Sequence, residues 1–300
     1  MIKKLLYGLL ALVVLVCVAG AVVWQVKGEQ WRAEYAAYRK TGAPILMYHA
    51  VGNEQGPDWP RSLIMPPALF EEHLRYLKEQ GYTIVSVEQL AHRLEKGESV
   101  DKFVALSFDD GYKDNHSVAL PIMQKYDAKG SFFVINKEMG DKDHMNEAEI
   151  KDMLAAGMEL GSHTYSHAPL AKIDTKYLVW ELDTSRYWLK KKFDGYIVRT
   201  LAYPNGSYNK TVIEAAQKYG FYRALTGHIG LNTSATYKAA PMEMYRVTVA
   251  DDGNGLEGFK RRLEQAYFFG FLQTKGIDIN PVRDVFAGYS ARLRRIYGMS

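Results

Sequence analysis

The chain has 300 residues, of which 47% are hydrophobic and 24% charged, and it carries one cysteine and a formal net charge of +4. These values exclude a disordered chain, a collagen-like repeat and a coiled coil, allow one large or two small domains, and give no reason to expect nucleic acid as a partner. Because Cys17 lies in an apolar N-terminal segment, the composition also excludes a disulfide framework, a cysteine-ligated zinc ribbon and a cysteine nucleophile.

The first 24 residues are predicted to be a membrane anchor or a signal segment. Leu5 to Trp24 is a run of twenty residues without a charge, and at about 1.5 Å per residue it matches a bilayer core of ~30 Å. A cleaved secretory signal has only ~7–15 apolar residues, so an anchor is favoured, although Ala19-Gly20-Ala21 could be a cleavage site. Residues 25–43 are polar, contain helix formers and are predicted to form a stem.

Residues 44–252 alternate short β-rich runs with helical patterns. Strands are predicted at Ile45–His49, Tyr82–Val85, Phe103–Phe108, Ser131–Ile135, Met158–Ser162, Ile197–Tyr203, Tyr222–Leu225 and Met244–Val249. The clearest helices are predicted at Pro67–Gln80, from Asn146 to near Gly157, at Lys176–Phe193 and at Ser207–Tyr219. This alternation predicts an α/β domain with a parallel sheet, open or closed into a barrel, and a functional site at the carboxyl ends of the strands.

Two clusters of polar residues follow predicted strands. Asp109 and Asp110 come directly after Phe103–Phe108, and because successive side chains point in different directions, one carboxylate can bind a metal while the other accepts a proton. His163 and His167 follow the fifth strand, and histidines four residues apart on a helical turn can bind one ion. A simple Asp-Gly turn and two surface histidines are the alternatives, but the two clusters together favour a metal site.

The chain resembles the metal-dependent polysaccharide deacetylases (carbohydrate esterase family 4). Ser107-Phe-Asp-Asp-Gly111 and His163-Thr-Tyr-Ser-His167 are similar to the first two motifs of this family, and Leu201-Ala-Tyr-Pro-Asn-Gly206 is similar to the third. The resemblance covers roughly residues 44–249 and implies a distorted (β/α) barrel with about seven parallel strands. It is greatest to the enzymes that act on poly-β-1,6-N-acetylglucosamine.

The resemblance also implies roles for individual residues. Asp110, His163 and His167 would hold one divalent ion, with zinc as the default and cobalt or nickel as alternatives. Asp109 would be the general base, and a backbone N–H near Asn205 would stabilise the oxyanion. Together with Asn205, the residues expected to line the substrate groove are Tyr203, Pro204 and Gly206.

The general acid is less directly indicated, because the usual late Leu-x-Leu-x-His motif of the family is missing. The first strand, however, ends at His49. In a closed barrel the first and last strands are neighbours, so a permuted motif order would put His49 in the same position. His49 is therefore the proposed acid, His228 the reserve candidate, and a histidine that only caps its strand the alternative.

The third motif departs from the family pattern at two positions. Ala202 stands where the family has an arginine, so Arg199 and Arg246 become the candidate partners for Asp109; Asn205 replaces a tyrosine. Tyr203 and Tyr48 could stack on a sugar ring, but buried packing is at least as plausible.

The remaining histidines are not expected to belong to the site. His73 and His92 are predicted to lie on helix surfaces, His116 to cap a helix and His144 to lie in a charged loop. Residues 253–300 hold eight basic and four acidic residues. This basic-aromatic extension is expected to pack on the barrel, with a membrane surface or a protein partner as alternatives.

The leading hypothesis is a membrane-tethered or secreted hydrolase outside the cytoplasm. It would remove acetyl groups from the N-acetylglucosamine residues of an extracellular or cell-wall polysaccharide and release acetate. The first alternative is a non-catalytic glycan-binding component of a polysaccharide synthesis or export assembly. The second is an iron oxygenase with two histidines and one carboxylate, which the additional carboxylate of Asp109 disfavours.

Overall fold

The computed structural model describes residues 20, 28–52 and 63–282. The chain divides into two units, Met1–Arg39 and Lys40–Ser300. In the first unit, residues 28–38 form a helix within the predicted stem. The predicted anchor, residues 1–24, lies outside the described residues except for Gly20. Over the described ranges, no helix is both long enough and apolar enough to cross a membrane.

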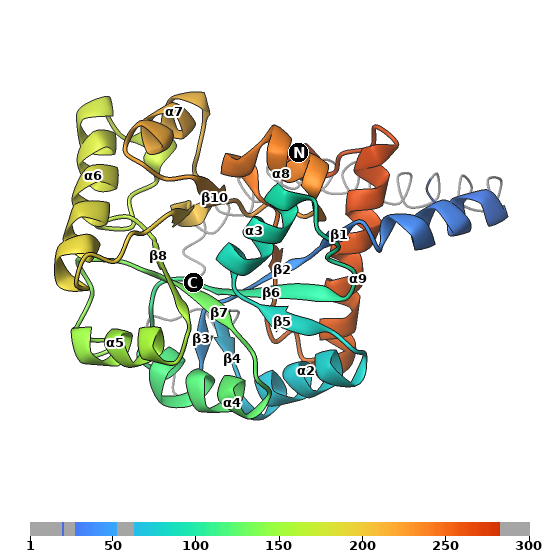
Figure 1. Ribbon diagram of the computed structural model, residues 1–300, viewed down its shortest axis with the longest axis horizontal. Helices are drawn as coiled ribbons and strands as arrows, with labels where there is room; N and C mark the ends of the chain where they lie inside the picture. The colour runs from blue at the N-terminus through green and yellow to red at the C-terminus, as the bar shows by residue number, and fades with distance from the viewer. Residues whose placement is uncertain (1–19, 21–27, 53–62, 283–300) are drawn as a thin grey trace, which may run out of the picture. The chain divides into compact units, whose positions relative to one another are not determined.

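Seven parallel strands of the second unit form a curled sheet in the order β10-β9-β8-β7-β6-β2-β12 (Figure 1). They are β2 (Ile45–Tyr48), β6 (Phe103–Phe108), β7 (Gly130–Val134), β8 (Glu159–Ser162), β9 (Thr200–Ala202), β10 (Arg223–Leu225) and β12 (Val247–Thr248). A parallel bridge between Leu225 and Met244 links β10 to the segment that leads into β12. The predicted α/β class with about seven parallel strands is therefore confirmed, in the form of a curled half-barrel.

The strands that the sequence did not indicate are all very short. β1 (Gly42–Ala43) pairs with β11 (Asn232–Thr233), and β3 (Ala50–Val51) pairs with β4 (Ile64–Met65). The eighth strand of the sheet, β5 (Thr83–Val85), was predicted and pairs with the first half of β6, while β7 pairs with its second half. Two residues are too few to show a period, which explains why these four strands could not be predicted.

The helices connect the strands and cover the sheet. They are α2 (Pro67–Glu79), α3 (Val87–Lys96), the π-helix η2 (Asn115–Ala119), α4 (Leu120–Lys125), α5 (Glu147–Ala155), η3 (Leu170–Lys172), α6 (Thr175–Lys192), η4 (Pro204–Gly206), α7 (Lys210–Lys218), α8 (Ser234–Ala239), η5 (Pro241–Glu243) and α9 (Gly255–Thr274). Asn146 and Glu149 form the predicted capping box at the start of α5.

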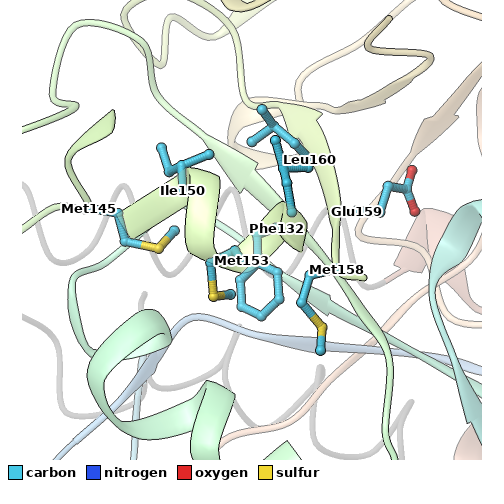
Figure 2. A pocket seen from close by; sticks show the side chains of 8 residues that line it. Phe132, Met145, Ile150, Met153, Met158, Glu159 and Leu160 are labelled. Carbon is cyan, nitrogen blue, oxygen red and sulfur yellow. The ribbon is translucent and has the colours of Figure 1, made fainter. Parts of the chain in front are cut away.

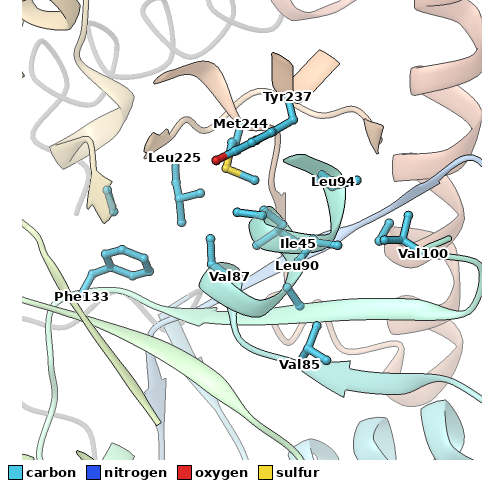
Figure 3. Packing of buried hydrophobic residues seen from close by; sticks show 14 residues of the cluster. Ile45, Val85, Val87, Leu90, Leu94, Val100, Phe133, Leu225, Tyr237 and Met244 are labelled. Atoms are coloured by element: carbon cyan, nitrogen blue, oxygen red, sulfur yellow. The ribbon is translucent and has the colours of Figure 1, made fainter. Parts of the chain in front are cut away.

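Helix α3 fills the inside of the curled sheet from the end at which the strands begin (Figure 3). Its apolar face packs against side chains that the strands direct inward. The members of this cluster include Val87, Leu90, Ala91 and Leu94 of α3 and Ile45, Ala105, Phe133, Ala202 and Leu225 of the strands. The first turn of α3 is fixed by Glu159, the first residue of β8, which accepts a hydrogen bond from the backbone N–H of Glu88 (2.8 Å). One end of the barrel is thus closed by an apolar plug, and the other end is left for the site.

Helix α9 packs against α2 and β12, as was expected, while residues 283–300 of the basic-aromatic extension lie outside the described residues. Phe259 of α9 stacks on His73 of α2 with ring centroids 4.0 Å apart. The prediction that His73 is a surface residue is therefore wrong: α9 covers it, and the Tyr48 hydroxyl lies 3.1 Å from its Nδ1. Burial lowers the pKa of His73 to about 3, so its ring is neutral.

Helix α5 packs beside β7 and β8 and leaves a small apolar cavity of about 10 Å³ (Figure 2). Its lining includes Phe132, Met145, Ile150, Met153 and Met158. A space of this size, with almost no polar group around it, is at the lower limit for holding a water molecule. It is a gap in side-chain packing and offers no room for a substrate.

Candidate metal centre and active site

The turn after β6 carries both carboxylates of the first motif, and Nε2 of His163 lies 4.0 Å from Oδ2 of Asp109 and 3.4 Å from Oδ1 of Asp110. Asp110 has a φ of 73° and Gly111 a φ of 80°, a left-handed turn that aspartate and glycine tolerate better than most residues. Gly111 is required for a second reason, because a Cβ at this position would lie 2.8 Å from Cγ1 of Val134. The predicted division of labour between Asp109 and Asp110 thus has a geometric basis in this turn.

Asp110 meets the two histidines of the second motif. Its Oδ1 lies 3.4 Å from Nε2 of His163 and 3.6 Å from Nε2 of His167. One possible ligand atom from each residue can be chosen so that all three lie within 4.8 Å of one another. The structure therefore brings together the three residues that the sequence predicted as metal ligands.

The loop that carries these histidines is not helical, contrary to the reasoning from their spacing. Residues 163–169 have no helical structure, and both Thr164 (φ 67°) and His167 (φ 60°) are left-handed. Hydrogen bonds from the loop fix its shape instead. The Ser166 N–H and hydroxyl both donate to the buried carboxylate of Glu181 on α6, and the His167 N–H donates to the Thr164 hydroxyl. Two imidazoles four residues apart thus converge through an irregular loop.

The protonation of His163 leaves its Nε2 available as a ligand. Its Nδ1 lies 2.9 Å from the Ala202 carbonyl oxygen, and because a carbonyl can only accept, Nδ1 carries the proton. Burial lowers the pKa of His163, although Asp109 and Asp110 act in the opposite direction. A neutral ring protonated at Nδ1 presents the Nε2 lone pair toward Asp110.

These atoms fit a divalent cation. Oδ1 of Asp110 is buried and has no hydrogen-bond partner among the described residues. A buried carboxylate oxygen without a partner is costly, and an imidazole lone pair directed at it provides no compensation. A cation held by this oxygen and by the two Nε2 atoms would satisfy all three, and imidazole and carboxylate are suitable ligands for zinc and related ions.

Asp109 is held by an arginine from a distant part of the chain. Nη1 of Arg246 lies 2.7 Å from Oδ1 of Asp109, and both side chains are buried. Burial alone would raise the pKa of Asp109, but Arg246, then His163 and His49, lower it to about 2. Of the two arginines considered from the sequence, Arg246 is thus the partner, whereas Arg199 pairs with Glu88 at 3.0 Å.

Comparison with known proteins identifies the family of this chain. The family model "Polysaccharide deacetylase" matches residues 96–224. YxkH of Bacillus subtilis, assigned to the polysaccharide deacetylases, is 30% identical over 239 residues, which are 78% of this chain and 81% of that protein. This chain belongs to the polysaccharide deacetylase family.

Two further polysaccharide deacetylase relatives extend the comparison. The poly-β-1,6-N-acetyl-D-glucosamine N-deacetylase of Staphylococcus epidermidis is 24% identical over 213 residues, covering 63% of this chain and 73% of that enzyme. The Streptococcus pyogenes deacetylase PplD, whose structure was solved in complex with acetate, matches 75% of this chain and 99% of its own with a TM-score of 0.67 and 28% identity. The chain is accordingly a polysaccharide deacetylase, a hydrolase that acts on amides, and enzymes of carbohydrate esterase family 4 use a divalent metal.

His49, the predicted general acid, directly follows strand β2. Strand β2, which ends just before His49, pairs with the two-residue strand β12, so the first and last strands of the parallel sheet along the chain are neighbours as predicted. Burial lowers the pKa of His49, while Asp109 and Asp110 act to raise it.

The reserve candidate, His228, faces a different environment. Its Nδ1 lies 3.3 Å from the Tyr208 hydroxyl. Its side chain lines a pocket of about 260 Å³ together with Glu243, Tyr245 and Asp278. These contacts give no indication that His228 shares the position of His49 beside the aspartates.

In the third motif, backbone groups are more accessible to a ligand than most of the side chains. Tyr203 is fully buried and stacks on Tyr208, with centroids 4.8 Å apart, and Pro204 is buried as well. Tyr203, and likewise the fully buried Tyr48, therefore cannot stack on a sugar at the surface. Asn205, by contrast, is exposed and left-handed (φ 54°), and Gly206 is partly exposed, so this short turn can present backbone groups to a ligand.

Other residues around the site were not singled out from the sequence. The Tyr112 hydroxyl donates a hydrogen bond to Asp110, and burial raises the pKa of this tyrosine. Tyr112 in turn stacks on His144, with centroids 5.1 Å apart. His92 is exposed, as predicted, whereas His116 faces Asp152 rather than capping a helix. Only the coordinates reveal Tyr112 and Glu181, because no sequence motif marks a side chain that supports a ligand.

Proposed function

We propose that this polysaccharide deacetylase is a metal-dependent enzyme that removes N-acetyl groups from an N-acetylglucosamine polymer outside the cytoplasm. The observation that carries the proposal is the buried Oδ1 of Asp110, which lies beside two imidazole Nε2 atoms and has no hydrogen-bond partner in the described part of the chain. A protein that only binds glycans has no need for this cluster, nor for an ionised Asp109 next to it. The S. epidermidis relative acts on poly-β-1,6-N-acetylglucosamine, which supports the choice of polymer.

In this proposal Asp110, His163 and His167 hold one divalent ion, with zinc as the default and cobalt or nickel as alternatives. When bound, the ion supplies polarisation of a carbonyl oxygen and a lowered pKa of water. The Ala202 carbonyl and the Tyr112 hydroxyl support two of the ligands and fix their orientation.

Asp109 accepts the proton from the water whose oxygen attacks the acetyl carbon. Its ion pair with Arg246 keeps the carboxylate ionised between turnovers. A backbone N–H of the Pro204–Gly206 turn donates to the oxygen on which negative charge develops.

His49 protonates the nitrogen as the bond between this nitrogen and the acetyl carbon breaks. Acetate leaves, and the sugar retains a free amine. The position of His49 at the end of β2, near both aspartates, supports this role. The predicted N-terminal anchor would keep the enzyme at the outer face of a membrane, beside its polymer.

Acetate release from defined oligomers tests the proposal. The full chain would be supplied with β-1,6- and β-1,4-linked N-acetylglucosamine oligomers, with and without a chelator, and acetate would be measured. We expect release that the chelator abolishes and that added zinc, cobalt or nickel restores. Binding of oligomers without acetate release under any of these metals would instead support the glycan-binding alternative.

A further inference from the structure

Helix α6 presents a row of exposed aromatic side chains. Tyr177, Trp180 and Tyr187, here called the aromatic stripe, are 60%, 45% and 65% exposed. At 100° per residue all three point to one side of the helix, and from Tyr177 to Tyr187 the stripe is about 15 Å long. Soluble proteins seldom expose aromatic rings in such a row without a ligand or partner.

Trp180, the middle residue of the aromatic stripe, contacts the loop that carries the metal-ligand histidines. Tyr165 lies between His163 and His167 in the loop that carries both histidines, and its ring is 4.5 Å from that of Trp180, edge to face. The next residue of α6, Glu181, accepts the two hydrogen bonds from Ser166 of the same loop. Helix α6 therefore supports the metal-ligand loop and also carries the exposed rings away from it.

The chemistry of the rings fits a sugar chain. An N-acetylated sugar is uncharged, so ion pairs cannot hold it, but its ring has apolar C–H faces and polar edges. Exposed tyrosine and tryptophan combine a flat apolar face with one polar group and can match both features. Because the stripe spans almost three turns of helix, it can contact more than one sugar of a chain.

We propose that the aromatic stripe binds sugar residues of the polymer that lie beyond the residue being deacetylated. This inference rests on the proposed function and deepens it, because it makes the enzyme one that prefers long chains. A membrane surface is the competing occupant, since aromatic residues and the three lysines Lys190–Lys192 at the end of α6 also suit a lipid interface. The contact between Trp180 and the metal-ligand loop favours the glycan.

The test compares long and short substrates. The double variant combines Tyr177→Ala and Tyr187→Ala in the full chain. Trp180 is kept because its ring packs against that of Tyr165. For a long N-acetylglucosamine oligomer we expect KM to rise about five- to tenfold with kcat little changed, as two stacking contacts are lost. For the dimer, which cannot reach along the helix, both constants should be unchanged.

The matched control is Tyr222→Ala. Tyr222 is also 60% exposed but lies outside helix α6, directly before β10. This variant should keep the wild-type KM for both substrates. An unchanged KM for the long oligomer in the double variant would overturn the proposal.

Two further measurements separate the possible failures. Sedimentation with anionic phospholipid vesicles would identify a lipid surface if the double variant loses vesicle binding and keeps its KM. If the wild-type protein released no acetate from any oligomer, the proposed function would fail. Calorimetric titration of the long oligomer into wild type and double variant would still decide whether the stripe binds glycan.

Discussion

Strand β8 has a buried ionisable group at each end, and the hydrogen bonding around these two groups differs. At its start, the carboxylate of Glu159 accepts hydrogen bonds from the Ser131 and Thr200 hydroxyls and from the N–H of Glu88. Just past its other end, His163 faces the Asp110 carboxylate, one oxygen of which has no such partner among the described residues. Burial is therefore common to both ends, and the difference lies in the Asp110 oxygen that has no hydrogen-bond partner among the described residues.

Replacement of Asp110 gives the largest expected effect. Asp110→Asn should weaken metal binding and lower acetate release at least about a thousandfold, the equivalent of several kcal/mol of transition-state stabilisation. In the presence of a chelator the same variant should be no less stable than wild type, because an uncompensated buried charge has been removed. Metal titration and denaturant unfolding check the two statements, and a chelated variant that unfolds more easily would contradict the second.

Replacement of Arg246 tests the proposed role of Asp109 as the general base. Arg246→Met leaves Asp109 buried without its cation, so we expect a loss of stability of about 3 kcal/mol and a rise in the pKa of Asp109. A general base must be deprotonated, and activity is lost as the pH falls through its pKa. The acid limb of kcat/KM should therefore move to higher pH.

Arg246→Lys provides the matched control for that experiment, because it keeps a positive charge and should shift the acid limb less. An identical acid limb in wild type and in both variants would mean that Asp109 does not act as the base.

Glu159 is the structural counterpart of Asp110. Glu159→Ala should lower the free energy of unfolding by about 2 kcal/mol, because Ser131, Thr200 and the first turn of α3 lose a shared acceptor. In the folded variant, kcat for deacetylation should stay near the wild-type value. Thermal unfolding and acetate release at a temperature well below the transition would check this, and a large drop in kcat would show that the two ends of β8 are coupled.

Replacement of His73 gives the smallest expected effect. This residue also shows that a buried atom without a hydrogen-bond partner does not by itself indicate a ligand site. Its Nε2 is also buried without a partner among the described residues, but its ring stacks on Phe259. Since its pKa falls from 6.5 to about 3 on folding, the unfolded chain binds a proton that the folded chain does not. Below pH 6.5 the stability should therefore decrease by about 1.4 kcal/mol per pH unit on account of this residue.

His73→Phe should remove that contribution while keeping a ring against Phe259. The fall in unfolding free energy between pH 7.5 and pH 5.5 should then be smaller than in wild type by roughly 1 kcal/mol. Urea unfolding at the two pH values measures it, and an equal fall in both proteins would show that other groups cause the acid sensitivity.

Much of the architecture could be predicted from the sequence because long apolar runs determine it. Phe103–Phe108 matches its predicted strand at both ends, whereas Ile197–Tyr203 was predicted too long. The excess residues include Val198, whose carbonyl accepts a hydrogen bond from Nε of Arg186 instead of a neighbouring strand. Tertiary contacts of this kind leave no trace in a local pattern.

The sequence predicts the residues of the site, but not the side chains that hold these residues in position. Asp110, His163 and His167 follow strands and form a recognisable motif, yet the conformation of their loop depends on Glu181, more than ten residues further on. Arg199 and Arg246 were equivalent candidates by spacing, and only the fold brings one of them to Asp109. His73 was misassigned because α9, which covers it, follows almost two hundred residues later.

The pairing of β2 with β12 has a practical consequence for the design of truncated variants of this protein. The family model ends at residue 224 and starts at residue 96, so a fragment cut to those limits would lack both His49 and Arg246. It would also expose the edge of β6 that β2 covers in the intact sheet, an open edge that invites aggregation. A truncated protein that is to fold and catalyse deacetylation must therefore begin before Ile45 and continue past Thr248.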